Sequence, residues 1–253
     1  MDGMDEMDGV IGAGTAIVTG GSQGFGFALS RALLAQGWRV VIDARDRARL
    51  AAAVELLGAG APADGAATGS ARLQAVAGDV TDAAHREHLV AAAGRRLDLL
   101  VHNASELGPS PLPPLAAHPL DVLERVLQVN VAAPVGLTQL ALPLLARSPV
   151  PTVVTMSSDA AVEAYAGWGV YGASKAALDN VAAVLAVEEP VLRVYAFDPG
   201  DMRTAMQQRA FPDQDISDRA APAEVVPALL RLLALRPPSG RFTAHDLHTG
   251  QPA

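Results

Sequence analysis

Short apolar runs alternate with longer segments of helical periodicity along most of the chain. Runs rich in valine, leucine and isoleucine are typical of buried strands, whereas apolar residues spaced three and four apart are typical of helices. The predicted strands are residues 16–19, 39–43, 73–77, 97–102, 152–157 and 192–197, with a further short strand near residue 242. The predicted helices are residues 25–36, 45–57, 81–93 and 120–147, and one more begins near residue 171.

This alternation predicts the α/β class. Strands separated by helices of this length form a parallel sheet that is covered by helices on both faces. We therefore expect a single doubly wound Rossmann-type domain over residues 13–253, with a sheet of about seven strands. The acidic residues 1–12 are expected to form a flexible tail, and residues 58–70, rich in glycine and alanine, a flexible surface loop.

Composition narrows the classes of function. Half of the residues are apolar and only 4% are aromatic, which favours helices packed on a parallel sheet. There are no cysteines, so disulfides and thiolate metal sites are excluded. The net charge is −8 and no basic stretch occurs, which argues against nucleic-acid and membrane partners. The acidic first residues show no signal pattern, so we expect a cytoplasmic protein.

One lysine is set apart from the arginines. Lys175 is the only lysine among the 19 lysine and arginine residues. It follows Tyr171 by four residues, a spacing that places both side chains on one face of a helix. Lysine is a compact point charge and arginine a broad planar fork, so a position that keeps lysine is suited to chemistry or ligand binding. A cation beside Tyr171 is expected to lower the pKa of its hydroxyl and suit it to proton transfer.

A glycine-rich turn, from Thr19 to Gly26, links the first predicted strand to the first predicted helix. Glycines let the backbone approach a pyrophosphate, and the N-terminus of the following helix supplies amide donors. This setting predicts a dinucleotide site. At the end of the second strand, Arg45 favours the 2′-phosphate of NADP(H), while Asp43 leaves NAD(H) as an alternative.

Further motifs follow this turn in a fixed order. They are Asp79-Val80, Asn103-Ala104, Asn130, Ser158, Tyr171 with Lys175, Pro199-Gly200 and Thr204. With these motifs the chain resembles the short-chain dehydrogenase/reductase family over nearly its whole length. Gly167-Trp168-Gly169 and Met206-Gln207-Gln208 are similar to the sepiapterin reductase-like branch of that family.

The resemblance implies a catalytic set of Asn130, Ser158, Tyr171 and Lys175. In such a set Tyr171 gives a proton to a carbonyl oxygen, Ser158 holds that oxygen, Lys175 binds the nicotinamide ribose and Asn130 holds a relaying water. The implied cofactor residues are Gly20, Ser22, Gln23, Gly24, Phe25, Gly26, Arg45, Asp79, Val80, Asn103, Ala104, Tyr171, Lys175, Pro199, Gly200 and Thr204. The expected walls of the substrate pocket are Leu107, Trp168, Met202, Met206 and Phe211.

These expectations lead to an NADPH-dependent oxidoreductase that reduces a ketone or aldehyde to an alcohol. Two alternatives stay open: an NAD-dependent alcohol dehydrogenase working in the oxidative direction, and a dinucleotide-sensing protein without turnover. The resemblance also implies a homodimer or homotetramer built on the two long helices. His85 and His88 lie three apart without a third ligand, so we expect a surface pair and no metal site.

Overall fold

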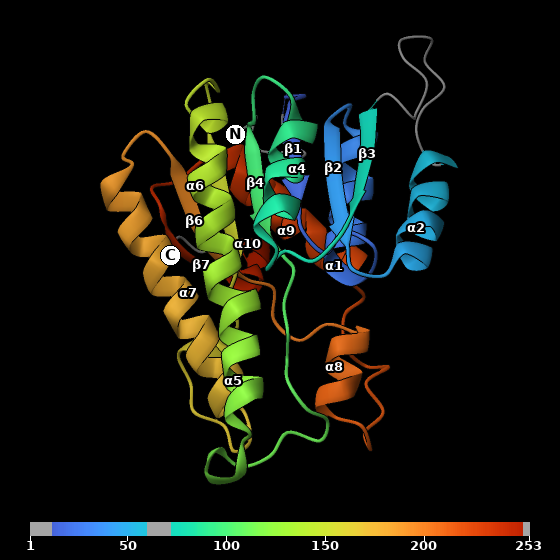
Figure 1. Cartoon of the computed structure of the whole chain (residues 1–253), viewed down its shortest axis with the longest axis vertical. Helices are drawn as coiled ribbons and strands as arrows, with labels where there is room; N and C mark the ends of the chain where they lie inside the picture. The colour runs from blue at the N-terminus through green and yellow to red at the C-terminus, as the bar shows by residue number, and fades with distance from the viewer. Residues whose placement is uncertain (1–11, 60–71, 250–253) are drawn as a thin grey trace, which may run out of the picture.

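The computed structural model describes residues 12–59 and 72–249. A seven-stranded sheet lies between two layers of helices (Figure 1), and each strand runs parallel to its neighbours. The strands are β1 (Thr15–Val18), β2 (Arg39–Ala44), β3 (Leu73–Ala77), β4 (Leu99–His102), β5 (Thr152–Met156), β6 (Arg193–Asp198) and β7 (Gly240–Thr243). Their order across the sheet is β3-β2-β1-β4-β5-β6-β7, the doubly wound arrangement that the sequence predicts.

Helices cover both faces of this sheet. The α-helices are α1 (Gly24–Ala35), α2 (Arg47–Ala59), α4 (Ala83–Ala93), α5 (Leu120–Leu127), α6 (Ala133–Leu145), α7 (Gly169–Glu188), α8 (Ala205–Ala210), α9 (Pro222–Leu235) and α10 (Ala244–Thr249). Short 3₁₀ turns are η1 (Leu115–Ala117) and η3 (Asp159–Ala161), and a π-helical turn, η2 (Gln128–Ala132), joins α5 to α6.

The two-residue period of the strands divides the core into two layers. On β1, Ala16 and Val18 face a cluster with α1, α2, α9 and α10, whereas Ile17 faces a cluster with α4, α6 and α7. On β6, Tyr195 and Phe197 join the first cluster in the same way. The inner strands β1, β2, β4, β5 and β6 are buried at most positions and are largely apolar, which makes them recognisable in the sequence.

The helices depart from the sequence prediction in three places. The predicted helix 120–147 is instead α5, η2 and α6 in succession, with the π-helical turn at Asn130. No helix was predicted over α8, α9 or α10, although α9 buries seven residues. The predicted loop 58–70 begins inside α2, and its remainder, like the predicted tail up to residue 11, lies outside the described residues.

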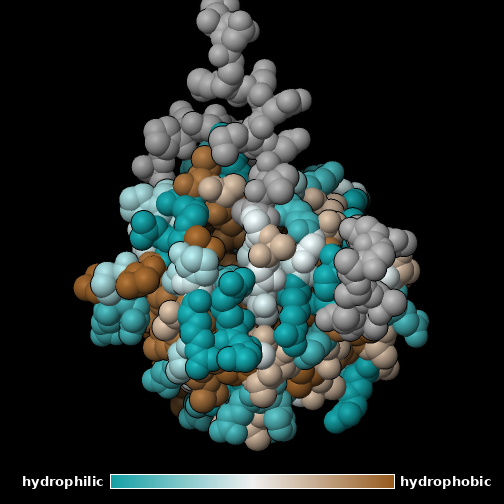
Figure 2. Space-filling view, turned by 90° about the horizontal axis from the view of Figure 1, so that it is seen from above, coloured by the Kyte–Doolittle hydropathy of each residue, from teal (hydrophilic) through white to brown (hydrophobic). Residues whose placement is uncertain are grey.

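The parallel direction of the strands gathers all their carboxyl ends at one end of the molecule. In Figure 1 this is the lower end, where α5 and α8 extend beyond the sheet. At the opposite end, shown in Figure 2, hydrophilic and hydrophobic residues are interspersed over the visible surface. Ligands of doubly wound sheets bind outside the carboxyl ends of the strands, so the lower end is where a site is expected.

Candidate active site

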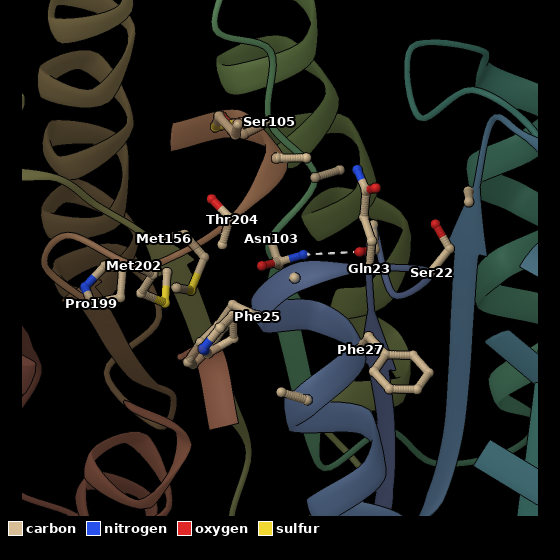
Figure 3. Close-up of a pocket in the computed structure, with 18 of the residues that line it drawn as sticks. Ser22, Gln23, Phe25, Phe27, Asn103, Ser105, Met156, Pro199, Met202 and Thr204 are labelled. Atoms are coloured by element: carbon tan, nitrogen blue, oxygen red, sulfur yellow. Dashed lines mark hydrogen bonds between the residues drawn. The ribbon is translucent and has the colours of Figure 1, made fainter. Parts of the chain in front are cut away.

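Two adjoining cavities lie at the carboxyl ends of the strands. The larger, of about 630 Å³, runs from the glycine-rich turn past the ends of β2 and β4 to the loop after β6. In Figure 3, Ser22 and Gln23 lie on one side of it, and Met156, Pro199 and Met202 on the other. The smaller, of about 90 Å³, continues beyond Tyr171.

The glycine-rich turn has backbone conformations that require glycine. Gly20 and Gly24 have φ values of 68° and 57°, in the left-handed region. Gly26 does not line either cavity, but a Cβ there would lie 2.6 Å from the Gly20 carbonyl oxygen and would overlap Asn103. The turn is thus packed too closely for side chains, and the N-terminus of α1 faces the larger cavity.

Asn103, the residue after β4, holds the glycine-rich turn in place by hydrogen bonds. Its side-chain amide donates to the carbonyl oxygens of Thr19 at 2.8 Å and Gly20 at 3.2 Å, and its backbone N–H donates to the Thr19 hydroxyl at 3.0 Å. Ala104 also donates its N–H to that hydroxyl. Asn103 and Ala104 therefore reach the cavity as parts of a rigid junction between two strand ends.

Asp43 has a structural task besides the one considered for it in the sequence. Its carboxylate is 1% exposed, accepts from the N–H of Gly20 at 2.6 Å and lies 2.9 Å from Nε2 of His85. It therefore supports the turn from inside, and it also lines the larger cavity next to Arg45. The expectation that His85 belongs to a surface pair was wrong: His85 is buried against Asp43, while His88 is exposed.

The end of the larger cavity beside β2 and β3 carries exposed arginines and one partly buried acid, Asp79. Arg45, directly after β2, and Arg49, in the first turn of α2, both line it, and Arg45 lies 3.4 Å from Glu106. Asp79 and Val80 line it after β3. Although partial burial opposes the change, the Thr81 N–H and the Arg125 guanidinium lower the pKa of Asp79 to about 2.

Tyr171 and Lys175 lie one turn apart on α7, where the two cavities meet. The Lys175 ammonium is 5.4 Å from the centre of the Tyr171 ring and donates to the Met156 carbonyl at 2.7 Å. Both side chains are buried. Of these two residues, Tyr171 lines both cavities and Lys175 lines the larger one alone.

The expected lowering of the Tyr171 pKa was wrong for this structure. Burial raises that pKa, with Asp198 and Asp159 adding to the rise, and the hydroxyls of Ser105 and Ser158 only oppose it. Burial also lowers the pKa of Lys175 to about 8, against the opposing charges of Asp179 and Asp198. Desolvation of the charged form therefore outweighs the neighbouring cation at Tyr171.

Ser158 follows β5 and lines the smaller cavity with Tyr171. Its hydroxyl donates to the Asp159 carboxylate at 2.8 Å and accepts from the Ala160 N–H at 3.2 Å. The neighbouring Ser157 also lines both cavities, and its hydroxyl donates to Asp179 at 2.6 Å. To hold a carbonyl oxygen, the Ser158 hydroxyl must exchange its bond to Asp159 for one to that oxygen.

Asn130 lies in the π-helical turn, and its side chain is 1% exposed. The amide oxygen accepts from the Glu106 N–H at 2.7 Å, while the amide nitrogen donates to the Glu106 carbonyl and the Ser174 hydroxyl, both at 2.9 Å. Asn130 thus ties the loop after β4 to α7. Its hydrogen bonds are to Ser105, Glu106 and Ser174, and it lines neither cavity.

A charge cluster that the sequence did not reveal lies behind Ser158. Arg241, on β7, donates to Asp198 at 2.7 Å, to the Ser158 carbonyl at 3.1 Å and to Asp179 at 3.3 Å. Burial raises the pKa of Asp179, and Arg241 and Ser157 counter it. The cluster joins β7, the end of β6 and α7 to the backbone of the Ser158 loop.

The remaining sequence-predicted residues are distributed as follows. Pro199, Met202, Thr204 and Met206 line both cavities, and Gly200, with a φ of 68°, lines the smaller one with Leu107 and Trp168. Phe211 lines neither: its ring packs 5.8 Å from that of Trp168 and supports it from behind. Among the described residues, no three His, Asp or Glu side chains group as metal ligands.

Comparison with known proteins gives the family. The short chain dehydrogenase profile matches residues 14–215. The protein belongs to the short-chain dehydrogenase family. It is 35% identical to mouse sepiapterin reductase over 210 residues, 81% of this chain and 80% of that one. It is 41% identical to the Escherichia coli oxidoreductase YciK over 139 residues, so that match spans about half of each chain, 54%.

A solved relative agrees with this assignment. The short chain dehydrogenase of Shigella flexneri, crystallised with NADP, superposes with a TM-score of 0.84 at 30% identity over 94% of this chain and 99% of that one. The protein described above is accordingly an oxidoreductase, and its family and solved relative support a nicotinamide dinucleotide as the cofactor. Its own residues fit that group, since the close-packed glycine turn leaves the α1 N-terminus facing a cavity large enough for it.

The charge cluster of this dehydrogenase gives a stability prediction. Arg241→Met removes the cation from two mostly buried carboxylates, and we expect the free energy of unfolding to fall by about 2 kcal/mol. Urea denaturation at neutral pH measures the change. Arg231→Met, at an exposed position of α9, is the control and should stay within about 0.5 kcal/mol of the unaltered protein. Equal losses in both variants would contradict a specific role for the cluster.

Proposed function

We propose that this short-chain dehydrogenase reduces a ketone or aldehyde to an alcohol with NADPH. The observation that carries the proposal is the position of Tyr171, whose hydroxyl-bearing ring alone of the Tyr171–Lys175 pair faces both cavities. Bound reduced nicotinamide supplies a hydride to the carbonyl carbon. The protein must then supply a proton to the carbonyl oxygen, at the junction where Tyr171 lies.

The protonation states of the pair suit the acid that reduction needs. The Tyr171 hydroxyl keeps its proton near neutral pH, as an ordinary tyrosine does, and burial raises its pKa further, which makes release of the proton harder. Lys175, with a pKa of about 8, is mostly an ammonium at that pH and stabilises the phenolate that remains after proton transfer. The Ser158 hydroxyl, once turned from Asp159, donates to the oxygen on which negative charge develops.

The preference for NADPH rests on the charges at the adenosine end of the larger cavity. Arg45 and Arg49 line that end, and both are about half exposed and able to meet a 2′-phosphate. Asp43, the acid that would favour the ribose of NAD, also lines the cavity, but its side chain is 1% exposed and already accepts from the Gly20 N–H. The NADP complex of the Shigella relative supports this preference.

The variant Tyr171→Phe tests the reaction. We expect kcat for a panel of aldehydes and diketones to fall about a thousandfold, because the phenyl ring has no proton to give, while NADPH affinity stays nearly unchanged. Turnover is followed by the absorbance of reduced nicotinamide, and affinity by calorimetry. Tyr165→Phe, at an exposed tyrosine, should keep full activity. A dinucleotide sensor would bind NADPH and turn over no carbonyl even before substitution.

The variant Arg45→Ala tests the cofactor. Loss of a charged partner for the 2′-phosphate should weaken NADPH binding by about tenfold to a hundredfold and leave NADH binding nearly unchanged. Arg47→Ala, two residues along and outside the cavity, removes the same charge and should change neither affinity. Equal NADPH affinity in the unaltered protein and Arg45→Ala would refute the assignment.

We also propose a homodimer or homotetramer. Two apolar helical stretches, Leu120–Leu145 and Gly169–Glu188, would be long enough to cross a membrane by length and composition alone. Each packs in the domain on one side and exposes apolar residues on the other: Leu120, Leu127, Leu140, Val184 and Val187. An apolar face of this kind fits a second copy of the chain.

Light scattering after size exclusion tests the assembly. The unaltered protein should have two or four times the chain mass of 26.0 kDa. The double variant Leu140→Glu with Val184→Glu should shift it toward one chain, because buried, unpaired charges oppose association. Leu56→Glu, at an exposed position of α2, should leave the mass unchanged. A monomeric unaltered protein at micromolar concentration would exclude the proposal.

A further inference from the structure

The smaller cavity, beyond Tyr171, has two kinds of wall. Its apolar part includes Leu107, Trp168 and Met206, and the Trp168 and Tyr171 rings meet edge to face at 5.6 Å. Its polar part includes three aspartates, and no arginine or lysine is among the residues that line it. A molecule that places its carbonyl at Tyr171 and extends into this cavity therefore meets an aromatic wall and carboxylates.

The three aspartates differ in how their charge is balanced. Asp198 is paired with Arg241 at 2.7 Å, and Asp201 lies 3.6 Å from Arg219 and accepts from Gln207. Asp159 accepts from the Ser158 hydroxyl and the Ala160 N–H, both at 2.8 Å, and forms no ion pair with the described residues. One uncompensated negative charge thus lies beside the serine that must hold the carbonyl oxygen.

The hydrogen bond between Ser158 and Asp159 also points to the chemistry of the ligand. A serine hydroxyl has one proton to donate. When it turns to a carbonyl oxygen, Asp159 loses that donor while staying beside the substrate. A substrate group with an N–H or a positive charge restores the lost interaction, whereas a carboxylate would add a second negative charge.

We propose that the smaller cavity selects an aromatic aldehyde or ketone that is uncharged or carries a cationic amine, and that Asp159 is the residue that disfavours carboxylates. This inference rests on the carbonyl reduction proposed above. The indole face of Trp168 suits both the aromatic ring and a nearby cation. Lys175 does not offset Asp159 in this cavity, because its ammonium lines only the larger one.

Three para-substituted benzaldehydes test the inference: one with a methyl group, one with a trimethylammonium group and one with a carboxylate. With NADPH and the unaltered protein at low salt, kcat/KM for the cation should exceed that for the carboxylate by at least about tenfold. In Asp159→Asn this ratio should fall by at least about tenfold. Comparing ratios between variants cancels the intrinsic reactivity of each aldehyde and any shared effect of Asp159 on Ser158.

Glu163→Gln is the matched control, because it removes one negative charge four residues along the chain, on an exposed side chain that does not line the cavity. Its ratio should equal that of the unaltered protein. A second measurement needs no variant: phenyltrimethylammonium should inhibit reduction of the methyl aldehyde competitively at a concentration at least about tenfold lower than benzoate.

The outcomes separate this inference from the reaction on which it rests. Reduction of the methyl aldehyde with equal kcat/KM for cation and carboxylate, or an unchanged ratio in Asp159→Asn, would overturn the charge selection and leave carbonyl reduction intact. Equal inhibition by the two benzene derivatives would overturn it as well. Failure to reduce any of the three aldehydes or the diketone panel would overturn the reduction and this inference together.

Discussion

The site is organised around the burial of one ammonium group. Taking a charge out of water costs several kcal/mol unless nearby dipoles and opposite charges replace the solvent. For Lys175 the replacement consists of the Met156 carbonyl and the carboxylates of Asp179 and Asp198. Those carboxylates are in turn held by Arg241. Arg241 on β7, the last strand of the sheet, therefore helps indirectly to stabilise the charge of Lys175 on α7.

The dinucleotide turn depends on a second buried charge of opposite sign. Asp43 takes the N–H of Gly20 and is met from behind by His85, so the first amide of the turn is used inside the protein. The amides further along, toward the α1 N-terminus, are the ones directed at the larger cavity. An acid that lines a nucleotide site can thus also hold the turn of that site in place.

Much of the fold could be predicted because its strands are buried on both faces. The apolar runs at residues 39–43 and 152–157 coincide with β2 and β5 to within a residue or two. Helix α9 was missed because Pro222 and Pro227 interrupt its pattern, although a proline at the first helical position is favourable. The pattern of apolar residues indicates which positions are buried. It does not reveal a helix such as α9, whose prolines interrupt the pattern although one of them favours the start of the helix.

The candidate site was predictable where its residues lie close along the chain. The four-residue spacing of Tyr171 and Lys175 indicates a shared helix face, and α7 has it. The pKa of Tyr171 was not predictable, since it depends on burial by groups from several elements. Asp43 with His85, and Asp198 with Arg241, are separated by 42 and 43 residues, and no local pattern connects them.

The π-helical turn at Gln128–Ala132 sets the rotational phase of the helix that follows it. Such a turn contains one residue more than an α-helical path, and one residue corresponds to about 100° of rotation. Without that extra residue, either Asn130 would leave the loop after β4 or the apolar stripe of α6 would rotate off the sheet. With the π-helical turn, the Asn130 amide meets the loop after β4 while the apolar residues of α6 face the core.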